Sequence, residues 1–363
     1  MNILMLNYEY PPLGGGGAAV CKELSEKLTT LGHTVTVLTM NMKGLENREI
    51  VNGVEIIRVK CIRKKNKVCH PWEQMTYCIS AYVFCKQNLN MDTYDIVHCH
   101  FIVPTGLLSL WLKKRFGIKY ILTAQGSDVL GHNNARFGLL YRLIKPEWKS
   151  IVRNAEILTA PSNYLIEKIR DSLSEQKCEL IPNGIDLEKY PTKEKTKSIV
   201  TLCRLQESKG IQDLLEALAG IDFNGWRVHI LGDGPYRREL EKLVFKYGLS
   251  DEVIFGGFIA ENEKLEYLGK AGLFFSGSRF EAMPISILEA MASSCRIIVS
   301  DIVPHRALLN RESIYTDIDE LKEKIQKICN EEPNEVEYDM NLYDWNRIVT
   351  QYESLYNSCV SQE

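Results

Sequence analysis

Hydrophobic runs and helically spaced apolar residues alternate along the chain in the order typical of α/β proteins. Residues 2–6 form an apolar run without polar alternation, as a parallel strand buried on both faces does. Val20, Leu24 and Leu28 follow at helical spacing. Gly32 then ends the helix, and a strand is predicted over Val35–Thr39. Further strands are predicted over residues 54–59, 96–99, 120–123 and 157–160.

The same alternation begins again at residue 199. Strands are predicted over residues 199–203, 227–231, 253–255, 273–276 and 297–300, and helices over 210–218, 236–247, 263–269, 284–293, 321–329 and 343–356. Such alternation predicts a parallel sheet with right-handed crossovers in each half. The polar run Asn183–Lys197, which contains Pro191, indicates a hinge. We therefore predict an α/β protein with domains at 1–185 and 198–342 and a hinge at 186–197.

Composition narrows the class of protein. The chain has 363 residues, 45% apolar and 25% charged, which suits two domains of about 150 residues each and argues against disorder. No apolar run reaches about 18 residues, and Met1–Asn7 lacks a basic region and a cleavage site, so neither a transmembrane helix nor a signal peptide is predicted. The 11 cysteines include no CxxC pair, which favours a reducing cytoplasm over a disulfide framework.

Charge is divided unequally between the halves. Residues 1–185 carry 23 basic and 16 acidic groups (+7), and residues 186–363 carry 21 and 31 (-10), which sum to the net charge of -3. The basic excess lies in two groups, which are Arg58, Lys60, Arg63, Lys64, Lys65 and Lys67, and Arg142, Lys145, Lys149 and Arg153. These cations predict either contact with an anionic membrane surface, peripheral to its inner face, or a solvated face. Aromatic residues are too sparse among them to favour nucleic acid.

The segment His98-Cys99-His100 could suggest a metal site. Neighbouring residues of a strand point to opposite faces, so only His98 and His100 could share an ion. Two ligands without a further set are too few for a typical site. We therefore predict a structural role for both histidines and no metal.

Gly14–Gly17 lie between a predicted strand and the start of a predicted helix. Backbone amides and the helix dipole there can bind an anion, and glycine lets a phosphate approach closely. The alternative is a flexible surface turn. The run does not match GxGxxG with an acidic residue about 20 positions on, which argues against a dinucleotide-dependent oxidoreductase.

Two cations, Arg204 and Lys209, follow the predicted strand 199–203. Ligands of open α/β sheets bind at this end of the strands, and an arginine fork with a lysine charge suits a diphosphate. The alternative is a pair of solvated surface cations. The segment Leu231–Pro235 forms a second loop of this kind before a helix.

The strongest signal lies in residues 276–292. Pro284 is predicted at the first helical position, which places Glu281 at the positive end of the helix. Glu289 follows within an apolar run, where a carboxylate needs a partner. The vicinal hydroxyls of a ribose or a hexose would satisfy it. The alternative is a capping glutamate at 281 and a surface glutamate at 289.

Together these segments resemble the retaining GT-B glycosyltransferases of family 4. The resemblance covers nearly the whole chain, because the motifs stand in the family's order. They are Tyr10-Pro11-Pro12 with the glycines, 31–35 (LGHTV), 125–128 (QGSD), 181–186 (IPNGID), Arg204 with Lys209-Gly210, 231–235 (LGDGP), 255–258 (FGGF), Glu281 with Glu289, and Trp345 in the last helix.

The resemblance implies two Rossmann-like domains facing across a cleft, with a C-terminal helix at about 343–359 crossing back to the first domain. The first domain would hold the acceptor and the second a nucleoside-diphosphate sugar as co-substrate. Transfer would retain configuration, by front-face attack without a required metal, because cations and helix termini stabilise the departing phosphate.

The resemblance also implies roles for individual residues. Arg204 and Lys209 would hold the diphosphate, Glu281 the hexose and Glu289 the ribose. The remaining contacts would come from Gly15 and Gly16 (phosphate), Gly232 (donor loop), Phe258 (base), and Ala282, Met283 and Pro284 (sugar).

Two positions depart from the family pattern. Gln125 stands where the family usually has histidine, so it can bind a hydroxyl but cannot carry a protonic charge. Ala282 replaces a usual glycine and requires a negative φ. We expect a transferase of a hexose or N-acetylhexosamine to a glycan, lipid-linked or small acceptor. An inactive nucleotide-sugar-binding homologue and a nucleotide-sugar 2-epimerase of the same fold are the alternatives.

Overall fold

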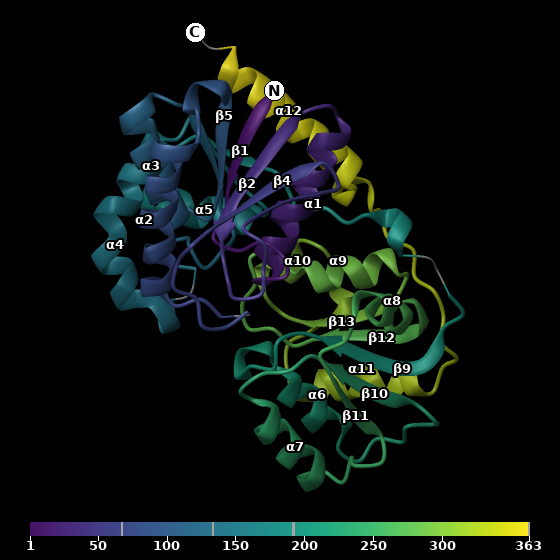
Figure 1. Ribbon diagram of the computed structural model, residues 1–363. Helices are drawn as coiled ribbons and strands as arrows, with labels where there is room; N and C mark the ends of the chain where they lie inside the picture. The colour runs from purple at the N-terminus through teal and green to yellow at the C-terminus, as the bar shows by residue number, and fades with distance from the viewer. Residues whose placement is uncertain (67, 133, 191–192, 362–363) are drawn as a thin grey trace. The chain divides into compact units, whose positions relative to one another are not determined.

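The computed structural model describes residues 1–66, 68–132, 134–190 and 193–361 (Figure 1). It divides into two compact units, one made of Met1–Gly184 with Trp345–Glu363 and the other of Ile185–Asp344. We predicted a hinge at residues 186–197, and this segment belongs to the second unit. It contains the 3₁₀ helix η2 (Leu187–Lys189) and the start of β9 (Thr196–Leu202). Pro191 lies outside the described residues. The chain therefore changes unit at 184–185 and again at 344–345.

The first unit contains an eight-stranded sheet with the order β3-β4-β2-β1-β5-β6-β7-β8. Its strands are β1 (Asn2–Leu6), β2 (Thr34–Met40), β3 (Arg48–Val51), β4 (Val54–Val59), β5 (Ile96–His100), β6 (Tyr120–Thr123), β7 (Ile157–Ala160) and β8 (Cys178–Leu180). All neighbours are parallel except β3 and β4. The sequence did not predict β3 or β8, because these edge strands are largely exposed and lack a continuous apolar run.

In the described part of this unit, six helices surround the sheet. They are α1 (Gly16–Thr30), α2 (Pro71–Asn88), α3 (Thr105–Phe116), α4 (Asn134–Asn154), α5 (Asn163–Ser172) and α12 (Trp345–Val360). The last of these is far away in sequence but belongs to the first unit. Tyr356 of α12 contacts His98 Nδ1 at 2.7 Å, and Glu353 contacts His33 at 2.9 Å. The rings of His98 and His100 stack at 4.6 Å, so the two side chains share a face, and His98 has the structural role that we predicted.

The second unit contains a six-stranded parallel sheet with the order β11-β10-β9-β12-β13-β14. Besides β9, its strands are β10 (Arg227–Leu231), β11 (Val253–Gly257), β12 (Ala271–Ser276), β13 (Arg296–Ser300) and β14 (Ile314–Tyr315). Its helices are α6 (Ile211–Leu218), α7 (Arg237–Lys246), α8 (Glu261–Lys270), α9 (Ile285–Ala292), α10 (Val303–Arg306) and α11 (Ile318–Cys329).

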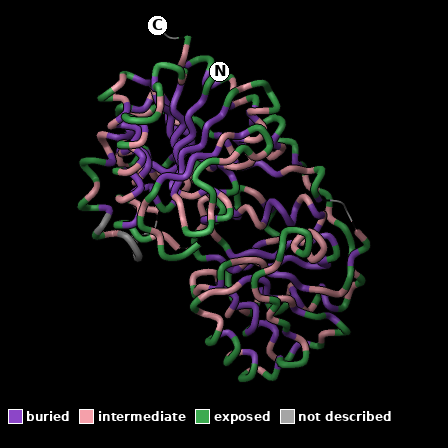
Figure 2. The backbone as a smooth tube through the Cα atoms, viewed as in Figure 1, coloured by how far each residue is buried: buried purple, intermediate pink, exposed green. Residues whose placement is uncertain are grey.

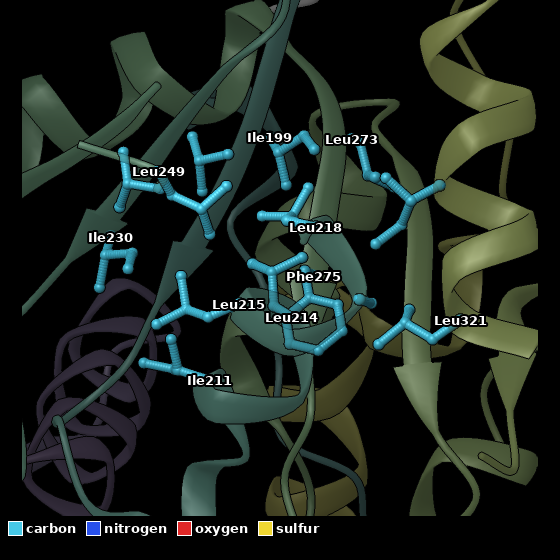
Figure 3. Close-up of a cluster of buried hydrophobic side chains, with 14 of the residues drawn as sticks. Ile199, Ile211, Leu214, Leu215, Leu218, Ile230, Leu249, Leu273, Phe275 and Leu321 are labelled. Atoms are coloured by element: carbon cyan, nitrogen blue, oxygen red, sulfur yellow. The ribbon is translucent and has the colours of Figure 1, made fainter. Parts of the chain in front are cut away.

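Apolar side chains fill both faces of this second sheet. On one face α6, α7 and α11 pack on the strands, and Leu214, Phe275 and Leu321 are fully buried there (Figure 3). On the other face α8 and α9 contribute Leu268, Ile287 and Leu288. Burial along the chain follows the strands, while the connecting loops remain exposed (Figure 2). Burial on both faces explains why the strands read as continuous apolar runs.

Two further observations concern the predictions from composition. None of the described helices is long and apolar enough to span a bilayer. All eleven cysteines are free thiols.

Candidate active site

The second unit brings the predicted donor-site residues to the carboxyl ends of its strands. The chain runs from β9 through β10 to β11 on one side and then returns to β12 on the other, so the topological switch lies between β9 and β12. Lys209 follows β9 and Glu281 follows β12. Ligands of open parallel sheets bind at such a switch point, and its two loops carry the two residues.

The loops after β9 and β12 are packed backbone against backbone. Gly210 has a φ of +65°, and a Cβ there would lie 1.9 Å from the carbonyl oxygen of Gly277. The amide of Arg279 also donates to the carbonyl of Ser208 at 2.9 Å. Only glycine allows this approach, because any side chain would force the loops apart. The position of Lys209 relative to Glu281 is therefore set by the backbone.

Lys209 and Glu281 form an ion pair, with Nζ 2.6 Å from Oε1. The side chains are 25% and 18% exposed, so the pair is partly desolvated but open to a ligand. Burial favours a lower pKa for Lys209, but the charge and hydrogen bond of Glu281 outweigh it and raise this pKa. Lys209 is therefore a cation throughout the neutral range, as a phosphate ligand must be.

Glu289 lies on α9 and is 8% exposed. We predicted that this carboxylate needs a ligand as its partner, but the chain supplies partners itself. Lys264 Nζ lies 2.6 Å from Oε1, and the Tyr190 hydroxyl donates to the same oxygen at 3.0 Å. Burial raises the pKa of Glu289, and Lys264 opposes this rise. Both contacts from the described residues go to Oε1, so Oε2 can still accept a hydroxyl.

Three other predicted residues lie at the same end of this sheet. Gly232 follows β10 with a φ of +117°, and a Cβ there would meet the carbonyl of Cys203 at 1.9 Å. Arg204 is exposed and has no ion pair with the described residues. Phe258 follows β11, the edge strand, and is 68% exposed. Gly232 is thus fixed by packing, whereas Arg204 and Phe258 are available for contact.

Residues 282–284 form the entry to α9. Pro284 is the N-cap, so it precedes the helix instead of occupying its first position as predicted. Ala282 is not among the residues with positive φ, so the requirement that we placed on this alanine is met. Met283 is half-buried. Glu281 lies three residues before this N-cap, so it precedes the helix N-terminus, an end that attracts negative charge.

Two side-chain networks that the sequence did not reveal support the loop after β12. Asp213 of α6 accepts from Arg279 at 2.6 Å and from the Tyr315 hydroxyl at 2.8 Å. Ser300 donates to the carbonyl of Ser278 at 2.5 Å, and His305 Nδ1 contacts the carbonyl of Ser300 at 2.8 Å. These partners come from α6, β13, β14 and α10, and no local sequence motif predicts the contacts.

The first unit has its own switch point, between β1 and β5. The glycine run follows β1, with Gly15 as the N-cap of α1 and Gly16 as its first residue. Gln125 follows β6, and its Nε2 donates to His100 Nδ1 at 3.2 Å. Burial lowers the pKa of His100 to about 3, so this imidazole is neutral and can accept the bond. The amide oxygen of Gln125 is left facing Gly17.

Asp128 ties these loops together. Its carboxylate accepts from the amide of Ile102 at 2.6 Å and from the amide of Gln125 at 2.9 Å. Burial raises the pKa of Asp128 to about 6, against the lowering effect of those amides. The loops after β5 and β6 are therefore joined by one nearly inaccessible carboxyl group.

The basic group at 58–67 is smaller than the sequence suggested. The Arg58 side chain is buried and pairs with Glu49, and the Arg63 side chain is fully buried and pairs with Glu9. Lys67 lies outside the described residues. Lys60, Lys64 and Lys65 are exposed, as are Arg142, Lys145 and Arg153, while Lys149 is half-buried. Within the described residues, no group of three or more His, Cys, Asp or Glu is arranged to hold a metal.

Known proteins resemble the chain along most of its length. Residues 14–189 match the model of Glycosyltransferase Family 4, and residues 184–345 match that of Glycosyl transferases group 1. The alpha-monoglucosyldiacylglycerol synthase of Streptococcus pneumoniae is 26% identical over 82% of this chain and 70% of its own. An uncharacterized glycosyltransferase of Methanocaldococcus jannaschii, MJ1607, is 27% identical over 83% of this chain and 81% of its own.

Solved structures match the fold. Sucrose-phosphate synthase from Thermosynechococcus elongatus superposes with a TM-score of 0.80 at 19% identity, with both chains covered completely. HepE from Anabaena, in complex with UDP-glucose, gives a TM-score of 0.74 at 16% identity over 99% of this chain and all of its own. With consecutive family models matched from residue 14 to 345, the chain belongs to the group 1, family 4 glycosyltransferases and has their GT-B fold.

Proposed function

We propose that the chain transfers a hexose or N-acetylhexosamine from a nucleoside-diphosphate sugar to a glycan, lipid-linked or small acceptor, with retention of configuration. The observation that carries the proposal is the Lys209–Glu281 pair, held by backbone packing at the switch point of the second sheet. A cation and a carboxylate at this place match the two parts of the donor, since one binds phosphate and the other sugar hydroxyls.

When the donor binds, contacts to the donor replace the ion pair between Lys209 and Glu281. The diphosphate oxygens take hydrogen bonds from Lys209 and from Arg204, which is exposed and has no ion pair within the described part of the chain. Glu281 then accepts from hydroxyls of the sugar, and the free Oε2 of Glu289 accepts from the ribose. Phe258, exposed at the end of β11, offers a surface for the base.

In the transfer step, the bond between the anomeric carbon and the phosphate oxygen breaks while the acceptor oxygen bonds to the same face of that carbon. The acceptor proton passes to the departing phosphate oxygen, so no separate base is needed. Lys209, Arg204 and the amides that begin α9 stabilise the growing negative charge. In this scheme fixed cations act where a divalent metal would otherwise be required.

The acceptor side is assigned to the first unit. Gln125 offers a neutral amide oxygen beside the start of α1, which suits a hydroxyl of the acceptor or of the sugar. The names of two similar proteins support the proposed acceptor and donor classes. A relative is an alpha-monoglucosyldiacylglycerol synthase, and a structural neighbour was solved in complex with UDP-glucose.

The test is a thermal-shift screen of UDP- and GDP-sugars on the full chain, followed by measurement of nucleoside diphosphate release with and without acceptors. We expect stabilisation by one class of nucleotide sugar and release that depends on acceptor. Lys209→Ala should lose both, while Lys242→Ala, which removes an exposed lysine paired to Glu239, should retain both.

Other results would reject the proposal. Stabilisation without release on any acceptor would indicate an inactive binding homologue, which the glutamine at position 125 makes the leading rival. Interconversion of the nucleotide sugar itself would indicate a 2-epimerase. Protection by NAD(P) alone would exclude a transferase.

A further inference from the structure

Helix α2 exposes apolar side chains on the side away from the sheet. Tyr77, Cys78 and Ala81 are fully buried against the unit. The opposite side carries an exposed stripe at helical spacing, made of Trp72 (46%), Met75 (36%), Ile79 (56%) and Val83 (43%). Single exposed apolar residues are common, but four on successive turns of one helix indicate a surface that is covered in use.

A second exposed pair lies on α4. Leu139 and Leu143 are 76% and 71% exposed and stand four residues apart. Helices α2 and α4 follow β4 and β6, so both begin at the edge where the parallel strands end. Trp72 and Leu139 are therefore near the same edge of the sheet as the glycine run and Gln125, on helices that lie on the same side of the unit (Figure 1).

The charges beside α2 have one sign. Between Glu55 and Asp92 the single acidic residue is Glu73. This carboxylate is fully buried and accepts from the amides of Lys64 and His70 at 2.9 and 2.7 Å. The exposed charged residues of this stretch are therefore cations, and Lys64 Nζ lies 5.3 Å from the ring of Trp72.

Cations also flank the leucines of α4. A hollow between α4 and α5 is lined by Arg142, Lys145 and Lys168, with Asp171 as its acidic residue. Lys168 pairs with Asp171 at 3.6 Å, but Arg142 and Lys145 form no ion pair with the described residues. Glu147 is the one acid of α4, a turn beyond Leu143. Unpaired cations in a hollow beside exposed leucines suit a phosphate at the surface of an apolar phase.

We propose that this surface, the docking face, binds an anionic lipid bilayer. It consists of Trp72, Met75, Ile79, Val83, Leu139 and Leu143 with Lys64, Lys65, Arg142 and Lys145. The apolar side chains would enter the boundary of the acyl chains while the cations meet lipid phosphates. A second copy of the chain is disfavoured as the occupant, because face-to-face pairing would bring like charges together.

The inference rests on the proposed function in one respect, since it selects a lipid-linked acceptor from the three acceptor classes. The docking face is at the edge of the first sheet that carries Gln125. A bilayer bound there would bring the headgroup of a membrane-embedded acceptor to that edge without extracting it from the membrane.

The test is sedimentation of the full chain with vesicles of phosphatidylcholine alone or with a third of phosphatidylglycerol. We expect binding that requires the acidic lipid and weakens with salt. Arg142→Ser with Lys145→Ser should lower the partition coefficient about 30-fold, since each cation near an anionic surface contributes a factor of about five. Leu139→Ser with Leu143→Ser should lower it more than tenfold. The matched controls, Phe245→Ser (83% exposed on α7) and Lys242→Ser, should leave it unchanged.

Several outcomes would overturn the docking face. These are equal sedimentation with and without acidic lipid, an equal loss in the controls, calorimetric binding of inorganic phosphate without vesicle binding, or a dimer dispersed by the leucine substitutions. Vesicle binding is measured without donor, so its failure is separable from failure of the transferase. Transfer to a soluble glycan without vesicle binding rejects only the docking face, and vesicle binding without nucleoside diphosphate release rejects only the proposed function.

Discussion

The two parallel sheets end in sites of opposite character. In the second unit the strand ends carry paired charges, Lys209 with Glu281 and Lys264 with Glu289. In the first unit the corresponding edge carries Gln125 bonded to a neutral His100, and Asp128 with a raised pKa. The shared topology determines where ligands bind, and the local charges determine which part of a reaction each edge can serve.

The difference matches what each edge would stabilise in the proposed reaction. A leaving diphosphate gains negative charge in the transition state, and fixed cations lower its energy. A hydroxyl acceptor is neutral, so an amide oxygen suffices to orient it. The charged edge is therefore suited to the proposed donor. The other edge, called the neutral edge because its accessible group is the Gln125 amide, is suited to the acceptor.

The largest expected effect is on the charged edge. Glu281→Ala and Lys209→Ala should each lower kcat about 10³-fold, because each removes a group that we propose to act on the donor during transfer. Circular dichroism and thermal melting should show folded proteins. Retention of wild-type turnover by both variants would show that the donor binds elsewhere. The contrast between a donor edge and an acceptor edge would then fail.

Glu289→Ala should lower the free energy of unfolding by about 3 kcal/mol, because Lys264 would remain largely buried without its inner partner. The matched control is Glu261→Ala, since Glu261 pairs with the same lysine at 2.7 Å but is 62% exposed. Its removal should cost less than about 1 kcal/mol. Equal losses in urea denaturation would mean that burial does not distinguish the two pairs.

The neutral edge makes a prediction about pH. Asp128 ionises near 3.8 when unfolded and near 6 when folded, so between these values the folded protein holds a proton that the unfolded chain has lost. Its contribution to the free energy of unfolding therefore falls by about 3 kcal/mol as pH rises from 3.8 through 6. His100, with its lowered pKa, acts in the opposite direction. The measurement is thus the difference in stability between wild type and Asp128→Asn, and an identical difference at pH 4 and pH 7 would contradict the assignment.

The smallest effect is expected at Phe258. Phe258→Ala should raise the KM for the donor about fivefold without changing kcat, because ring contact with a base contributes about 1 kcal/mol and acts equally on ground and transition states. Phe245→Ala, which removes another exposed phenylalanine of the same unit, is the control. A fall in kcat at Phe258 would place this side chain closer to the reacting centre than proposed.

The sequence predicted the features that depend on a local pattern of residues, namely the buried strands and the residues that follow them. Strands buried on both faces read as apolar runs, and residues that follow such strands, such as Lys209 and Glu281, gather at one edge because parallel strands end together. The edge strands β3 and β8 were not predicted, because they are largely exposed and therefore lack a continuous run of apolar residues. Pro284 was placed one residue too far into its helix, since the cap and the first helical position both tolerate proline.

Partners distant in sequence could not be predicted. Tyr190 and Lys264 reach Glu289 from 99 and 25 residues away, and His100 reaches Gln125 from 25. Each contact depends on the stacking of separate βα units, which single-chain periodicity does not encode. Likewise Arg58 and Arg63 read as surface charge, and only folding shows them buried against Glu49 and Glu9.

The placement of α12 has a consequence for biosynthesis. The second unit is one continuous stretch, Ile185–Asp344, whereas the first needs Trp345–Val360, the helix whose Tyr356 bonds the buried His98. Because a chain emerges from its N-terminus, the first unit cannot complete its structure until α12 has emerged after the whole of the second unit. The unit translated first is therefore finished last, and until then the apolar surface that α12 covers lacks its partner.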